Sequence, residues 1–194
     1  MMRKITNLFI LLYVAIAGCQ NKVPSFSGEA AFTHLVNQCD FGPRNPGSIG
    51  HKNALKYFME VLVPLADTVY TQSYTETMPR TNQKVGMNNV IARFNIRAKE
   101  QIMISAHWDT RPWGDRGISQ VDRENPILGA NDGASGGAVI LELARILKNT
   151  SPGIGVTWFF LMQKITAPAE IHGLTVKDRS ILPKIYPFPF QTMP

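Results

Sequence analysis

The chain has 194 residues, of which 44% are hydrophobic and 18% are charged, so its composition is that of a globular protein and excludes disorder along the whole length. The formal net charge of +6 does not indicate nucleic-acid binding, because Arg3 and Lys4 contribute +2 and residues 161–194 contribute another +2. The remaining +2 is spread over residues 5–160 without a basic block or interleaved aromatic residues. We therefore expect no nucleic-acid partner.

The N-terminal segment has the pattern of an export signal. Arg3 and Lys4 precede an apolar run, residues 8–17, that is too short to span a bilayer. The motif Ile-Ala-Gly-Cys that ends at Cys19 resembles the lipobox of bacterial lipoproteins. The resemblance implies that residues 1–18 are removed, that Cys19 carries lipid, and that the protein is held to a membrane on the periplasmic or cell-surface side. An ordinary signal peptide, in which Cys19 has no role, is the alternative.

Two helices are predicted at the start of the folded domain. Residues 19–28 are small and polar, as expected of a tether. The domain is then predicted to begin at residue 29, with one helix over residues 29–38 and a second over residues 51–62, where apolar residues recur at helical spacing. Pro64 ends the second helix.

Three strands are predicted next. Residues 68–74 alternate in polarity and are rich in β-branched residues, residues 89–94 are a second strand candidate, and residues 102–106 form a compact apolar run. We expect the strand over residues 102–106 to be central in the sheet.

The strand over residues 102–106 is followed by a loop, a helix and another strand. A loop rich in Gly, Pro and Asp covers residues 110–125, and loops of that length usually belong to a functional site. The clearest helix of the chain begins at Asp132 or Ser135 and ends near Asn149, and a buried strand is predicted over residues 156–160. This βαβ order predicts an α/β fold with a sheet that is at least partly parallel.

The last part of the chain, residues 161–194, does not continue this pattern. It contains five prolines and no convincing apolar period. Proline lacks a backbone donor and fixes φ, so residues 185–194 can form neither a central strand nor a helix. We therefore expect residues 29–160 to be an incomplete domain, followed by a Pro-rich tail, with the strand over residues 156–160 exposed at the edge of the sheet.

Two motifs carry the chemistry. Ser-Ala-His-Trp-Asp-Thr, residues 105–110, ends a strand, and Gly-Ala-Asn-Asp-Gly-Ala-Ser-Gly, residues 129–136, opens a helix. In parallel sheets, ligands bind at the carboxyl ends of the strands. His107 and Asp109 alternate along an extended backbone, so the Asp109 carboxylate can orient a metal-ligating imidazole, while Asp132 suits both a helix cap and a metal ligand. A merely hydrogen-bonded histidine is the alternative for the first motif alone.

These motifs resemble those of bacterial glutaminyl-peptide cyclotransferases and their zinc aminopeptidase relatives. Cys-Asp-Phe-Gly-Pro-Arg, residues 39–44, and Pro-Ile-Leu, residues 126–128, add to the resemblance, which runs from about Ala30 to Phe160. It implies a three-layer αβα fold of the zinc-peptidase kind, with a mixed, largely parallel sheet that is incomplete on its C-terminal side.

The resemblance also implies roles for individual residues. Asp132 and His107 become zinc ligands, although in the cyclases the equivalent of His107 lines the pocket, and Asp109 becomes the catalytic residue that supports His107. Trp108 and Trp113 become walls of the substrate pocket, with ordinary packing as the alternative. The implied partner is a peptide with a free N-terminus.

One motif of the family is absent. After the strand that corresponds to residues 156–160, relatives carry Asp-Ala-Glu-Asp-Tyr-Gly or a similar stretch, which supplies the general acid/base and a zinc ligand, and a later histidine supplies another. Residues 161–167 read Leu-Met-Gln-Lys-Ile-Thr-Ala instead. Synonymous codons for these residues can encode the missing motif in another frame, so we hypothesise a frameshift after Phe160. The nucleotide sequence rejects this hypothesis if no other frame contains the motif.

The family performs two reactions. Cyclases convert an N-terminal glutamine to pyroglutamate and release ammonia, whereas aminopeptidases hydrolyse the first peptide bond. The residue sequence of the motifs favours the cyclase. Because two protein ligands do not complete a catalytic zinc site, we expect weak or no zinc binding and an inactive chain. A membrane-anchored lipoprotein that binds a ligand without catalysis is the alternative from another class.

Overall fold

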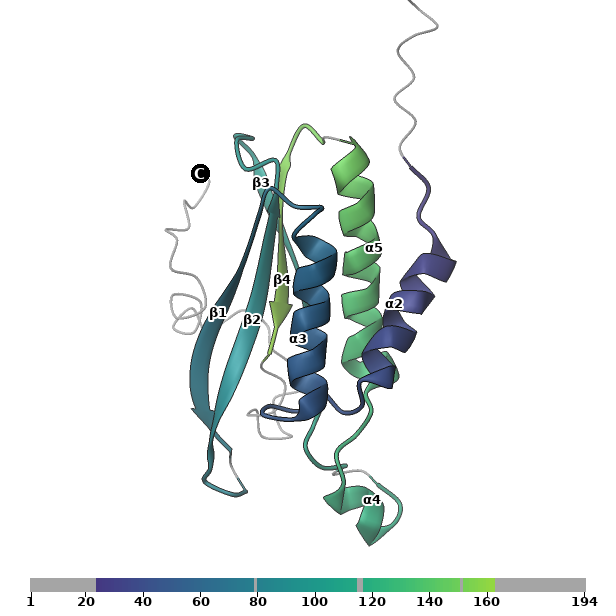
Figure 1. Ribbon diagram of the computed structural model, residues 1–194, viewed down its shortest axis with the longest axis vertical. Helices are drawn as coiled ribbons and strands as arrows, with labels where there is room; N and C mark the ends of the chain where they lie inside the picture. The colour runs from purple at the N-terminus through teal and green to yellow at the C-terminus, as the bar shows by residue number, and fades with distance from the viewer. Residues whose placement is uncertain (1–23, 79, 115–116, 151, 163–194) are drawn as a thin grey trace, which may run out of the picture.

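The computed structural model describes residues 24–78, 80–114, 117–150 and 152–162, and it shows a β-sheet with helices packed on one side (Figure 1). The predicted signal segment with Cys19 lies outside the described residues, and so do residues 163–194 of the predicted tail over residues 161–194. The first two residues of that tail belong to the folded part, because Leu161 ends the last strand and Met162 is buried. No helix within the described ranges is long and apolar enough to cross a membrane.

The sheet has four strands in the order β1-β2-β4-β3. β1 (Thr68–Thr77) pairs antiparallel with β2 (Lys84–Phe94), and β2 pairs antiparallel with β4 (Gly155–Leu161). β4 pairs parallel with β3 (Gln101–His107). The predicted α/β class with a mixed sheet is confirmed, and each predicted strand is present with somewhat longer bounds. The described sheet is not largely parallel as we expected, because two of its three strand pairs are antiparallel.

The helices begin where the sequence places capping residues. The Ser27 hydroxyl accepts a hydrogen bond from the Ala30 backbone at the start of the first helix, and the Ser48 hydroxyl accepts one from His51 at the start of the second. A short helix lies within the predicted loop over residues 110–125. The helical segments are α2 (Gly28–Asp40), α3 (Ile49–Leu62), α4 (Gln120–Glu124), the π-helical turn η1 (Ala130–Ala134) and α5 (Ser135–Thr150).

Two expectations about the position of strands are wrong for the described sheet. β4 is not exposed at an edge but lies between β2 and β3, and β3, which we expected to be central, forms an edge. The reason is the crossover through α5, which returns the chain to the side of β3 that faces β2. A compact apolar run indicates burial, but it does not indicate which neighbour a strand has.

The core lies between the sheet and the two helices α3 and α5, and α2 packs on the outer side of α5 (Figure 1). The described helices thus form one of the two helical layers that an αβα fold requires. Each element contributes a stripe of fully buried apolar side chains. The core consists mainly of Ala54, Phe58 and Leu62 of α3, Ile140, Leu141 and Ala144 of α5, Val90, Ala92 and Phe94 of β2, and Val156, Trp158 and Phe160 of β4.

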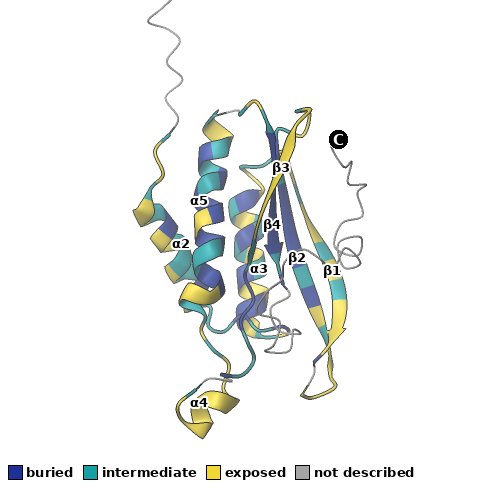
Figure 2. Ribbon diagram, turned by 180° about the vertical axis from the view of Figure 1, so that it is seen from behind, coloured by how far each residue is buried: buried dark blue, intermediate teal, exposed yellow. Residues whose placement is uncertain are grey.

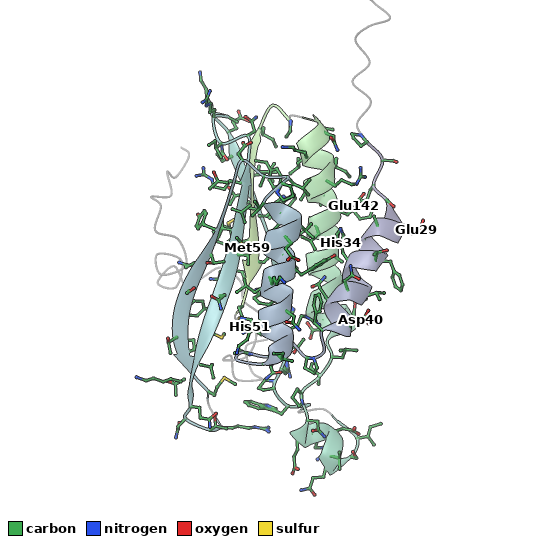
Figure 3. All side chains as sticks on the ribbon, viewed as in Figure 1. Glu29, His34, Asp40, His51, Met59 and Glu142 are labelled. Atoms are coloured by element: carbon green, nitrogen blue, oxygen red, sulfur yellow. The ribbon has the colours of Figure 1, made fainter. Side chains whose placement is uncertain are left out.

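A buried carboxylate fixes the segment that precedes α2. Glu142 of α5, labelled in Figure 3, has no exposed side-chain surface. Its Oε1 accepts a hydrogen bond from the Ser27 backbone at 2.8 Å, and the Arg145 guanidinium donates to both of its oxygens at 2.6 and 2.8 Å. Arg145 also donates to the Ser25 carbonyl at 3.1 Å. The hydrogen bonds from Arg145 lower the pKa of Glu142.

This pair predicts a pH dependence of stability. Because the pKa of Glu142 is lower in the folded state than in the unfolded state, its stabilising contribution is present at neutral pH and is lost as the pH falls through the folded-state pKa. Urea unfolding at pH 7 and at pH 3.5 should therefore show a smaller loss of stability for Glu142→Gln than for the wild type. Glu60→Gln, which removes only an exposed pair with Lys56, should follow the wild type at both pH values.

Candidate functional site

The predicted site residues lie where β3 ends and α5 begins. His107 is the last residue of β3, and Trp108 and Asp109 follow it directly. On the other side, Asp132 lies in η1, where φ −109° and ψ 81° depart from helical values and break the helix before α5. The connection between them, which contains α4, extends below the helices in Figure 1.

The structure brings His107, Asp109 and Asp132 together. His107 Nε2 lies 2.9 Å from Asp132 Oδ1, and His107 Nδ1 lies 3.3 Å from the Asp109 carbonyl oxygen and 3.4 Å from Asp109 Oδ1. The Asp109 carboxylate is fully buried, whereas 28% of the His107 side chain and 47% of the Asp132 side chain are exposed. The imidazole is thus held by the Asp109 backbone carbonyl, beside the buried Asp109 carboxylate, on one nitrogen, and it faces the accessible Asp132 carboxylate with the other.

This geometry can be tested against a zinc ion. Two ligands of a tetrahedral zinc, each about 2.0–2.1 Å from the metal, lie about 3.3 Å apart. An imidazole nitrogen and a carboxylate oxygen are both common zinc ligands, and His107 Nε2 and Asp132 Oδ1 lie 2.9 Å apart, close to that separation. The two atoms therefore fit two corners of such a site. Among the residues that the structure describes, no group of three or more His, Cys, Asp or Glu could hold a metal. The pair therefore fits part of a zinc site.

Glycines leave room for this arrangement. A Cβ on Gly133 would lie 2.9 Å from the His107 ring, and a Cβ on Gly136 would lie 2.9 Å from the Ala106 side chain. Any side chain at Gly133 would therefore push the imidazole away from its position. The small residues of the second motif are explained by this close approach of η1 and α5 to the end of β3.

Arg44 joins the segments around the site, and we did not predict this role from the sequence. Its side chain is fully buried, and its Nε donates to the Trp108 carbonyl at 3.1 Å. Nη1 donates to the Gln38 carbonyl at 3.0 Å and Nη2 to the Gly129 carbonyl at 2.8 Å. One guanidinium thus ties the end of α2 to both motifs. Burial lowers the pKa of Arg44, yet an arginine keeps its charge under all ordinary conditions.

His51 is a second buried polar residue that the sequence did not identify. It lies at the start of α3, at the lower end of that helix in Figure 3, with its ring 5.1 Å from the Trp108 ring. Its Nδ1 accepts from the Gly47 backbone at 3.2 Å, and Nε2 lies 3.2 Å from the Asn88 amide. Burial lowers the pKa of His51, which favours a neutral ring at pH 7. Its contacts are those of a packed histidine.

The end of β4 is also held firmly beside the site. The Asn89 side chain accepts a hydrogen bond from the Met162 backbone at 2.9 Å, and the Tyr74 hydroxyl donates to the Met162 carbonyl. Burial raises the pKa of Tyr74, so this hydroxyl stays protonated. The backbone that leaves β4 is therefore fixed at the same end of the sheet as His107, which is paired with Leu161.

The two tryptophans have different surroundings. Trp108 is fully buried, and its ring packs edge-on against Phe58 at 5.3 Å, so the structure places it in the core. Trp113 is half-buried, and the Arg80 guanidinium lies 4.3 Å above its ring in a cation–π contact. Their roles as walls of a substrate pocket stay predictions.

Comparisons with known proteins agree with the motifs. Residues 89–162 match the sequence profile described as Peptidase family M28. No curated protein matches the chain. Among solved structures, a glutaminyl cyclase from Bacteroides thetaiotaomicron, bound to N-acetylhistamine, is 32% identical, with a TM-score of 0.71, over 78% of this chain and 52% of that chain.

Two similar structures have peptidase descriptions. A Zn-dependent exopeptidase from Parabacteroides distasonis is 31% identical, with a TM-score of 0.72, over 80% of this chain and 53% of that chain. A leucine aminopeptidase precursor from Bacteroides thetaiotaomicron is 34% identical, with a TM-score of 0.70, over 78% of this chain and 52% of that chain. The chain thus spans about half the length of the solved structures that it matches.

Proposed function

Since residues 89–162 belong to Peptidase family M28, we propose that this chain carries the first half of a zinc-dependent glutaminyl-peptide cyclotransferase. One observation carries the proposal: the imidazole of His107 and the carboxylate of Asp132 lie 2.9 Å apart at the carboxyl end of a parallel strand. The glutaminyl cyclase from Bacteroides thetaiotaomicron supports the choice of activity.

The residues of this chain would prepare the reaction as follows. Asp132 would hold the zinc, which supplies polarisation of a substrate carbonyl when it is bound. His107 would line the pocket beside it in a cyclase and would be a second zinc ligand in an aminopeptidase. Asp109, buried beside Nδ1, would fix the orientation of the ring and raise the basicity of Nε2. In the cyclase reaction, the α-amine of an N-terminal glutamine attacks its own side-chain amide carbon, and the C–N bond of that amide breaks to release ammonia.

We propose that the chain by itself does not catalyse this reaction. A catalytic zinc usually has three protein ligands, and the described residues bring two together. The acidic stretch expected after residues 156–160 is replaced by Leu161, Met162 and the residues that follow. Measurable cyclisation of a glutamine-initiated peptide by the purified chain would contradict this inactivity.

An aminopeptidase is the second candidate within the family. It is favoured by the leucine aminopeptidase precursor and the exopeptidase among the similar structures, at 34% and 31% identity. Release of ammonia from a glutamine-initiated peptide indicates the cyclase, whereas release of the first amino acid indicates the peptidase.

Zinc binding tests the proposed site directly. We expect the full chain to bind one zinc weakly, and His107→Ala and Asp132→Asn each to weaken that binding by at least about 10-fold, because each removes a ligand. Isothermal titration with zinc measures the affinity. Glu29→Gln, which changes an exposed carboxylate on α2, is the control and should bind as the wild type does. Equal zinc affinity in Asp132→Asn and the wild type would reject the site, whereas weaker binding in Asp132→Asn alone would leave His107 the pocket-lining role that it has in the cyclases.

We further propose that the protein is exported and anchored to a membrane through lipid on Cys19. The motif before Cys19 supports this proposal. In a bacterial host fed with radioactive palmitate, the wild-type chain should be labelled and Cys19→Ser should not. Cys39→Ser, which removes the other cysteine, should keep the label. Equal labelling of wild type and Cys19→Ser would contradict lipidation at this residue.

A further inference from the structure

Two buried polar side chains hold the two ends of η1, the turn that carries Asp132. The C-terminal end of α2 lies beside the start of α5 (Figure 2). Gln38, in the last turn of α2, is fully buried, and its Nε2 donates to the carbonyl of Ala134, the last residue of η1, at 3.1 Å. At the other end, Arg44 donates to the carbonyl of Gly129, which caps the start of η1. Asp132 lies between these two points.

The Gln38 side chain is fixed in its own position. Its Nε2 also donates to the His34 carbonyl, one turn earlier on α2, at 3.0 Å, so both N–H groups of the amide are used. Its backbone carbonyl accepts a hydrogen bond from Arg44 Nη1 at 3.0 Å. A Cβ on Gly137 would lie 3.0 Å from Gln38 Oε1, so glycine at that position lets α5 pack closely on the amide. Gln38 therefore contributes to the contacts at both ends of η1.

η1 departs from helical geometry where it carries the carboxylate. Gly129 has a φ of +65°, and a Cβ there would lie 2.5 Å from Cγ2 of Thr110, so only glycine fits. Asp132 has a φ of −109° and a ψ of 81°. A backbone hydrogen bond from Ala134 to the Gly129 carbonyl closes the turn around these residues. The direction of the Asp132 carboxylate thus depends on where the two ends of η1 are held.

Stability alone does not explain an amide at position 38. Gln38 Oε1 is buried and has no hydrogen-bond partner among the residues that the structure describes. An unpaired buried acceptor costs about as much free energy as a hydrogen bond contributes, and an apolar side chain of the same size avoids that cost. The glutamine is therefore better explained by the place to which it directs its hydrogen bond than by a net gain in stability.

We propose that Gln38 is a positioning residue that acts through the Ala134 carbonyl and holds η1 in the shape that presents the Asp132 carboxylate to a zinc ion. It does not touch the metal itself, because its amide is buried between α2 and α5 and both N–H groups are used. The proposal rests on the proposed function, because it takes Asp132 to be a zinc ligand. Simple fastening of α2 to the domain is the alternative role.

A pair of matched variants in the full chain tests this role. Gln38→Met removes the donor but keeps most of the volume. Asn37→Met removes an amide from the neighbouring position of α2, where the hydrogen bond goes to the Tyr57 hydroxyl of α3 at 3.0 Å and not to η1. Isothermal titration measures the affinity for zinc, and hydrogen exchange measures the protection of the amides of residues 134 and 135, which donate to carbonyls of η1 and its cap.

We expect Gln38→Met to weaken zinc binding by about 3- to 10-fold, at or below the lower end of the effect of a residue that contacts a metal ligand directly. Exchange of the amides of residues 134 and 135 should become at least about 10-fold faster. Asn37→Met should change neither quantity. When Gln38→Met is added to Asp132→Asn, zinc binding should weaken no further, because the positioned ligand is already gone.

Several results would overturn the positioning role. They are unchanged exchange of these amides in Gln38→Met, an unchanged zinc affinity in Gln38→Met while Asp132→Asn binds more weakly, and a further loss of affinity in the double variant. Equal effects of Gln38→Met and Asn37→Met would also overturn it, since both amides would then only fasten α2. Faster exchange in Gln38→Met alone, in a chain whose wild type binds no zinc, supports the hold on η1 and counts against the proposed function.

Discussion

Replacing Arg44 with methionine is expected to lower the free energy of unfolding by about 3–5 kcal/mol, because three carbonyl groups, two of them in buried hydrogen bonds, lose a charged donor at once. These carbonyls belong to Gln38, Trp108 and Gly129, so the substitution also separates the two motifs that carry His107 and Asp132. Methionine fills much of the same volume, which limits the contribution of a cavity. Urea unfolding followed by circular dichroism measures the change.

Two further variants separate the hydrogen bonds of Arg44 from its charge. Arg44→Lys keeps the positive charge, but its single ammonium group cannot donate to three carbonyl groups as the planar guanidinium does. This variant should therefore recover only a small part of the stability that Arg44→Met loses. Lys56→Met removes an exposed cation from α3 and should change stability by less than about 0.5 kcal/mol. A methionine variant as stable as the wild type would show that Arg44 does not join these segments.

The second large effect is expected at Phe58, for which substitution by alanine should cost about 3–5 kcal/mol. The side chain is fully buried in α3, and its ring lies 4.8 Å from that of Phe160 and 5.3 Å from that of Trp108. The loss of these contacts and the cavity left behind both act against folding. Because Trp108 directly follows His107, the repacking should also weaken zinc binding.

Thermal or urea unfolding of Phe58→Ala measures this effect, and Phe32→Ala is its control. Phe32 lies on α2 and is 64% exposed, so its removal should change stability by less than about 0.5 kcal/mol. Equal losses of stability in the two variants would mean that α3 does not pack on the sheet through its buried residues Ala54, Phe58 and Leu62. A loss confined to Phe58→Ala supports the described core.

Local patterns in the sequence predicted the elements of the fold well. Helical spacing identified α3 and α5, and apolar runs identified β3 and β4, because each signal is contained within about a dozen residues. Strand order was not predictable in the same way, because β2 and β3 are neighbours in the chain but not in the sheet. That arrangement depends on which side of β3 the crossover returns to.

In the candidate site, too, features contained in a short segment were predictable, and contacts between distant segments were not. His107 and Asp109 are two residues apart, and the motif around Asp132 has a distinct composition, so the sequence alone identified all three. The function of Arg44 depends on contacts with carbonyl groups 64 and 85 residues further along the chain, and no local pattern reports such contacts. The resemblance of residues 39–44 to the family was the only signal that pointed to Arg44.

The placement of β4 between β2 and β3 has a consequence for the order of folding during synthesis. The hairpin of β1 and β2 can form as soon as residue 94 has left the ribosome, because its strands are consecutive. β3 has no partner within the described sheet until β4 appears, with 47 residues between the two strands. The inner edge of β2 therefore stays without its strand partner until β4 is made, and the last strand made is the one that joins the two parts of the described sheet.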